Sequence, residues 1–93
     1  MEFADEKCYE EMIVALHTFS SKVAEECEKM EQAGNDCVDN TENDPAAEKS
    51  NAKLQMCVTR FRGTISAAQQ VAVRLQAQLE RIREAARAAE SDD

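Results

Sequence analysis

The sequence predicts an all-α fold, an antiparallel hairpin of two long amphipathic helices. Apolar residues recur every seven positions in each half of the chain, which is the spacing of helices that pack along a seam. The 93 residues include only two glycines, Gly34 and Gly63, and one proline, Pro45. A β-sandwich or barrel needs turn residues about every ten positions. We therefore expect one domain over residues 1–93 in which a single short connection joins the two helices.

The first helix is expected over residues ~4 to 37. Its main apolar repeat runs at seven-residue intervals through Tyr9, Leu16, Val23, Met30 and Cys37. Intermediate positions hold Met12, Phe19 and Ala33, with Ile13 and Cys27 beside them. The helix should end between Ala33 and Val38, because Gly34 can adopt the left-handed conformation that closes many helices.

The turn is expected over residues ~38 to 44, and its strongest local signal is the pair Asp44-Pro45. The Asp44 carboxylate can accept a backbone N–H bond as the N-cap of a helix. Pro45 suits the first helical position, because that position needs no N–H donor and proline already has a helical φ. These two residues predict the start of the second helix.

The second helix is expected over residues ~44 to 89, and its apolar pattern is more regular than that of the first. One repeat of period seven contains Leu54, Phe61, Ala68, Leu75, Ile82 and Ala89. Another lies four residues after each of the first five, at Val58, Ile65, Ala72, Leu79 and Ala86. The two repeats together predict one continuous seam.

At about 1.5 Å per residue the two helices would be ~50 Å and ~68 Å long, so the second should overhang the first. Antiparallel pairing about residue 41 sets Cys27 opposite residues 54–57 and Leu16 opposite residues 62–67. Replacing Phe61 with Ala should cost about 3 kcal/mol or more if Phe61 is buried in the seam. The residues expected in the core or interface are Leu16, Phe19, Val23, Met30, Leu54, Val58, Phe61, Ile65, Leu75, Leu79 and Ile82.

A two-helix hairpin has one seam and cannot enclose all of its apolar side chains. Val14, Val38, Val71 and Val73 fall beside the seams and widen the apolar surface. We therefore expect association, most simply a four-helix homodimer, or a heterodimer with another helical protein.

The formal net charge of −8 argues against nucleic acids and anionic membranes as partners. The charge is unevenly distributed, since 13 acids and 3 lysines in residues 1–44 leave −10, while 6 acids and 8 basic residues in 45–93 leave +2. Arg60, Arg74 and Arg81 share one heptad register, and Arg62 and Arg83 share another. We expect the glutamates of the first helix to pair with these arginines, within one chain or between subunits, and such pairs would select the register more than stabilise the fold.

No run approaches the ~18 apolar residues of a membrane span, and the first residues, MEFADEKCYEE, are acidic where a signal peptide would be basic. We expect a cytoplasmic protein, or one that is exported without a signal peptide.

Known catalytic motifs are absent, and a helical hairpin offers no deep cleft, so we expect no enzyme activity and no small-molecule substrate. A catalytic role for His17 is improbable, because no nucleophile and acid accompany it in sequence. An EF-hand loop starting at Asp39 fails, because its sixth position is Asp44 and its twelfth is Ser50. No cofactor is implied.

The cysteines Cys8, Cys27, Cys37 and Cys57 form no CxxC pair, so a zinc site is not expected. Cys27 and Cys37 have CX9C spacing, but a second such motif is missing. The hairpin register brings Cys27 near Cys57, where a disulfide is geometrically possible. The alternative, which we favour, is that the cysteines are small apolar packing residues.

The Ala-, Gln- and Leu-rich second half, ISAAQQVAVRLQAQLERIREAARAAE, resembles the WXG-type helical-hairpin proteins of bacterial type VII secretion. It is most similar to members that lack the Trp-x-Gly turn, including partners of the LXG toxins. This resemblance implies a homodimer or heterodimer of hairpins that acts as a secretion substrate or as a targeting partner of a larger effector.

Two alternatives stay open. The stretch NDPAAEKSNAKLQ is similar to the turn of type III secretion needle subunits, which implies a polymerising hairpin. A cytoplasmic structural or adaptor protein, whose hairpin holds a partner helix, is the other. All three functions are non-enzymatic and depend on protein–protein association.

Overall fold

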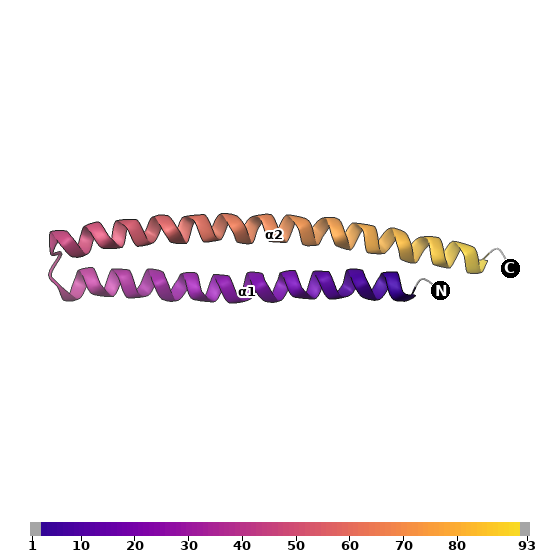
Figure 1. Ribbon diagram of the computed structural model, residues 1–93, viewed down its shortest axis with the longest axis horizontal. Coiled ribbons are helices and arrows are strands. Elements are labelled where there is room, and N and C mark those ends of the chain that lie inside the picture. Colours follow the sequence, from indigo (N-terminus) through magenta and orange to yellow (C-terminus); the bar gives the residue numbers. More distant parts are fainter. Residues whose placement is uncertain (1–2, 92–93) are drawn as a thin grey trace.

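The computed structural model describes residues 3–91 of the chain, and the side chains of residues 5–90. It contains two helices, α1 (Phe3–Asn40) and α2 (Pro45–Ser91), which lie antiparallel and side by side (Figure 1). This confirms the predicted all-α helical hairpin. The first helix continues three residues beyond its expected end. Residues 1, 2, 92 and 93 of the expected domain lie outside the described part.

The end of α1 is closed by two hydrogen bonds that reach back into its last turn. The Asn43 N–H donates to the Val38 carbonyl at 2.9 Å, and the Glu42 N–H donates to the Asp39 carbonyl at 3.2 Å. This is the bond pattern of a Schellman motif. Glu42 and Asn43 adopt the left-handed conformation, with φ values of 53° and 63°. The expected left-handed residue, Gly34, instead lies inside the helix.

The start of α2 is capped by Asp44. Its Oδ2 accepts hydrogen bonds from the backbone N–H groups of Ala46 at 3.1 Å and Ala47 at 3.2 Å. Pro45 is the first helical residue. The turn between the helices is therefore only four residues long. Backbone hydrogen bonds close it at the end of α1, and the Asp44 side chain closes it at the start of α2.

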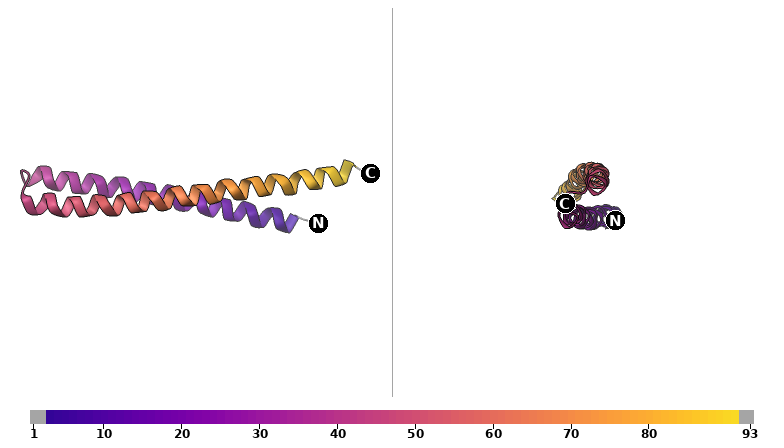
Figure 2. Two further views of the ribbon diagram at one scale, coloured as in Figure 1. Left: turned by 90° about the horizontal axis from the view of Figure 1, so that it is seen from above. Right: turned by 90° about the vertical axis from the view of Figure 1, so that its left-hand side faces the viewer.

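The hairpin is a rod of 74 × 14 × 14 Å in which the helices cross at a shallow angle (Figure 2). Its radius of gyration is 21.1 Å, whereas a compact domain of this length has about 12 Å. Its accessible surface is 6868 Å², compared with about 5,400 Å² for a compact protein of this mass. Much apolar surface is therefore left uncovered by the fold.

The core along α1 differs from the expected seam. The buried residues of α1 form a line of period seven, which we call the inner column: Ile13, Ser20, Cys27 and Gly34. The expected seam through Leu16, Val23 and Met30 flanks this line and is only partly buried. The helix is thus rotated about its axis relative to the prediction, and its contact line contains small residues.

The small residues of the inner column allow the helices to approach closely. A Cβ atom added to Gly34 would come within 3.0 Å of Leu54 Cδ2 and would also overlap the Asn51 side chain. Asn51 donates from Nδ2 to Asn35 Oδ1 at 3.2 Å and accepts at Oδ1 from Gln55 Nε2 at 2.9 Å. This polar cluster lies near the turn, where the short connection determines which residues of α1 and α2 face each other.

The pairing register also differs from the prediction. Gly34 faces Asn51 and Leu54, whereas pairing about residue 41 would set it opposite residue 48, so the register is displaced by about one helical turn. The difference follows from the longer α1, because a later turn shifts every opposing pair along α2.

Candidate functional site

The eleven residues expected in the core or interface fall into three groups. Val58 and Leu79 are almost fully buried, with exposed fractions of 1% and 2%. Phe19 and Phe61 are exposed by 43% and 47%. The remaining seven are partly buried, namely Leu16, Val23, Met30, Leu54, Ile65, Leu75 and Ile82.

The two exposed phenylalanines line a groove of about 330 Å³ between the helices. Phe19 comes from α1 and Phe61 from α2. The floor includes Val23, Cys27 and Met30, and the edges include polar side chains such as Lys22 and Glu26, together with Thr64. Because two aromatic side chains are left about half exposed beside an apolar floor, this concave surface is strongly hydrophobic.

The apolar surface continues along the rod beyond this groove. Met12 lies seven residues before Phe19 and Val71 lies seven residues after Thr64, so each shares a helix face with its counterpart. Their exposed fractions are similar to those of the phenylalanines. We call this surface the open face and define it as Met12, Phe19, Val23, Met30, Phe61 and Val71.

The opposite flank of the helix pair is closed by ion pairs. Arg62 donates from Nη1 to Glu31 Oε2 at 2.9 Å and from Nη2 to Glu31 Oε1 at 2.6 Å, a two-pronged arrangement. Arg83 Nη2 lies 3.6 Å from Glu10 Oε1. The hydrogen bond from Arg62 lowers the pKa of the Glu31 carboxyl and raises that of the guanidinium. Both pairs connect α1 to α2 on the same flank of the hairpin.

Pairing of the seam arginines with α1 of the same chain is observed for one of the two heptad registers, and pairing of the other register between subunits stays a prediction. Arg62 and Arg83 bind glutamates of α1, whereas Arg60, Arg74 and Arg81 make no hydrogen bond or ion pair to α1 over residues 5–90. The cause is helical geometry. Arg60, Arg74 and Arg81 stand on the outer side of the open face, two positions around the helix from the seam, where α1 cannot be reached.

All four cysteines are free thiols. Cys27 is 1% exposed and belongs to the inner column, whereas Cys57 lies on the surface of α2. The disulfide that the sequence allows between Cys27 and Cys57 is therefore not formed, because only one of the two thiols faces the seam. Cys8 and Cys37 are also exposed.

Ser20 was not expected in the core. It is 6% exposed, and its hydroxyl has no hydrogen-bond partner among the described residues. The sequence pattern does not predict this position, because large apolar side chains indicate a seam more strongly than a serine does. The available signal was the seven-residue spacing that relates Ser20 to Ile13, Cys27 and Gly34.

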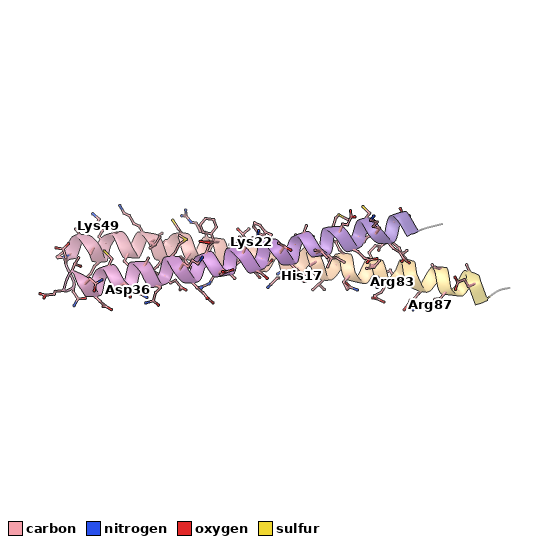
Figure 3. All side chains as sticks on the ribbon, turned by 90° about the horizontal axis from the view of Figure 1, so that it is seen from below. His17, Lys22, Asp36, Lys49, Arg83 and Arg87 are labelled. Carbon is pink, nitrogen blue, oxygen red and sulfur yellow. The ribbon has the colours of Figure 1, made fainter. Side chains whose placement is uncertain are left out.

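Within the part of the chain that the structure describes, no group of three or more His, Cys, Asp or Glu residues is arranged to hold a metal ion. Neither α1 nor α2, over these residues, has an apolar stretch long enough to cross a membrane. His17 and Lys22 lie on opposite sides of α1 (Figure 3).

Comparisons with family models, with curated proteins and with solved structures gave no match.

Proposed function

We propose that this hairpin is a non-enzymatic protein–protein interaction module whose open face binds a helical protein. The observation that carries the proposal is the groove with Phe19 and Phe61 at its sides, both about half exposed. Large aromatic side chains bury more apolar surface than other residues and dominate many interfaces. Leaving two of them in water, around one continuous groove, favours a surface that is covered in the working complex.

The shape of the molecule supports the same function. The rod exposes 6868 Å², roughly 1,500 Å² more than a compact protein of its mass. Stable interfaces remove about 800 Å² from each partner. One partner helix seated along the open face would therefore bring the exposed surface toward that of a compact domain.

The resemblance to WXG-type hairpins supplies the biological setting that we propose, a secretion-associated hairpin that pairs with a larger effector. Export without a signal peptide belongs to this proposal. Its test is the appearance of the tagged chain in the culture medium of the native host, compared with a strain that lacks the type VII ATPase. Retention of the chain in both strains would contradict export and leave an intracellular adaptor role.

Site-specific photocrosslinking in the native host tests the interaction itself. A photoreactive phenylalanine analogue is placed at Phe61, and in a matched control at Gly63, where nothing lies within 4 Å of an added Cβ. We expect a discrete crosslinked species from position 61 and none from position 63. Equal crosslinking at both positions, or none at position 61, would refute the open face as an interface.

A further inference from the structure

We infer that the open face is built to receive an acidic amphipathic helix of another protein in preference to a second copy of this chain. The inference rests on the proposed function and names the class of partner. It follows from the charges that border the open face, which differ from those on the opposite flank of the hairpin.

The open face has the length of a single helix segment. Along α1 it extends from Met12 to Met30, about 27 Å at the rise of an α-helix. Phe19 and Phe61 stand on either side of the groove, so a third helix laid between α1 and α2 would contact both. This is the geometry in which an amphipathic helix is bound as i, i+3/i+4 and i+7 anchors.

Both borders of this surface carry positive charge. On α1, Lys22 lines the groove directly, and Figure 3 shows it on the side of α1 away from His17. On α2, Arg60 lies one turn before Thr64, and the Arg81 guanidinium donates to Gln78. We call these border residues the cationic rim, which comprises Lys22, Lys29, Lys53, Arg60, Arg74 and Arg81.

Most of the cationic rim has no counter-charge within the hairpin. Over residues 5–90 the structure gives no ion pair to Lys22, Lys53, Arg60 or Arg74. On the opposite flank, by contrast, Arg62 and Arg83 are paired with Glu31 and Glu10. A chain of net charge −8 thus carries these four unpaired cations beside its exposed aromatic side chains.

The acids of the hairpin offer little compensation at this surface. Glu26 lines the groove, but its Oε1 already lies 3.4 Å from Lys29 Nζ. In a two-fold dimer through the open face, the cationic rims of both copies would border the same interface. Like charges would then meet on both sides, whereas glutamates flanking the apolar stripe of a foreign helix would meet opposite charges.

The test uses the full chain and two synthetic helical peptides of three heptads. Both carry Leu at a and d, one has Glu at every e and g position, and the other has Lys there. We expect the Glu peptide to bind about ten-fold more tightly at low salt, by fluorescence anisotropy, and the difference to shrink as salt is added. Light scattering should find the hairpin without peptide to be monomeric at micromolar concentration.

Charge reversal provides the matched variants. Replacing Lys22 and Arg60 with Glu should invert the preference, so that the Lys peptide binds more tightly. Replacing Lys7 and Lys49 with Glu changes the net charge equally, away from the open face, and should leave the preference in place. Circular dichroism confirms that each variant keeps its helices.

The inference would be overturned by equal binding of both peptides, by loss of preference in both variant pairs alike, or by a stable homodimer whose formation requires Phe19 and Phe61. The homodimer would still support the proposed function, because crosslinking at position 61 would then join two copies. Binding to anionic lipid vesicles but to neither peptide would overturn the inference as well. Absence of crosslinking at position 61 in the host would instead refute the proposed function.

Discussion

Gly34 and Gly63 are both interior helical glycines, yet their surroundings are opposite. A Cβ at Gly34 would collide with the Asn51 and Leu54 side chains, whereas one at Gly63 would meet nothing within 4 Å. Neither glycine has a positive φ, so neither is needed for a left-handed backbone. Gly34 is present because the two helices touch there.

This contrast predicts opposite effects of the same substitution. Gly63→Ala should stabilise the hairpin by about 1 kcal/mol, because alanine has the higher helix propensity and the site is open. Gly34→Ala should destabilise it by about 1–3 kcal/mol despite the same gain, because the methyl group overpacks the seam. Urea unfolding monitored by circular dichroism measures both. Equal stabilisation by the two changes would contradict the close contact between the helices at Gly34.

Ser20 is predicted to be a site of easy stabilisation. Its buried hydroxyl has no partner among the described residues, and an unpaired buried polar group costs about 1–3 kcal/mol. Ser20→Ala removes the hydroxyl and raises helix propensity, so we expect about 1 kcal/mol or more of added stability. The control, Ser21→Ala, changes an exposed neighbour and should gain only the propensity difference, about half a kcal/mol.

At the scale of the elements, α2 was predictable because its large apolar residues fall in two adjacent heptad positions. Those positions define one narrow stripe, and the structure buries Val58, Ala68, Ala72 and Leu79 within it. Asp44 and Pro45 mark the start of this helix through local chemistry, which needs no knowledge of the partner. For α2 the sequence pattern allows only one side of the helix to be buried, and that side is buried in the fold.

The rotation of α1 was not predictable from its pattern. Its apolar residues occupy three adjacent heptad positions, represented by Phe19, Val23 and Cys27. One partner helix covers only part of this wide apolar surface. The largest apolar side chains lie on the part that stays partly exposed, so their pattern predicts the wrong contact line. The fold covers the line with Ser20 and Gly34, because small side chains permit the closest contact between helices.

The Arg62–Glu31 pair gives the hairpin a pH dependence of definite sign. The hydrogen bond from Arg62 lowers the pKa of Glu31 in the folded state. A carboxyl with a lowered folded pKa stabilises the fold above its unfolded pKa, about 4.3, and loses that contribution as the pH falls through the folded value. The parent should therefore lose stability relative to Glu31→Gln on acidification below about pH 4.5.

The measurement is the free energy of unfolding of parent and variant between about pH 7 and about pH 3. Arg62→Gln should give the same pH profile as Glu31→Gln, since either change removes the pair. If the difference between parent and variant stays constant over this range, the two-pronged pair contributes nothing in solution.

At the scale of the whole molecule, stability and association should depend on different residues. Leu79 is 2% exposed and Phe61 is 47% exposed. Leu79→Ala should cost about 2–5 kcal/mol. Phe61→Ala should cost only about 2 kcal/mol, which revises the larger value expected for a buried position. Denaturant unfolding of the isolated chain distinguishes them, and a greater loss from Phe61→Ala would place that ring in the core.

The open face itself could be anticipated only in part. The excess of apolar residues over one seam predicts that some face is left uncovered, but its position depends on the rotation of α1. Which arginines form ion pairs depends on the same rotation, because it decides which side of α2 the glutamates of α1 reach. Arg62 lies on that side and Arg60 on the other. The position of the open face therefore follows from the contact line between α1 and α2.

Because both helices repeat every seven residues, the length of the rod can change in steps of one heptad. Removing one heptad from α1 and the opposing heptad from α2 would leave every remaining layer matched and the turn from Thr41 to Asp44 untouched. Each such step would shorten the molecule by about 10 Å. The distance between the turn and the two chain ends is thus a quantity that insertion or deletion can adjust in fixed increments, while the fold stays the same.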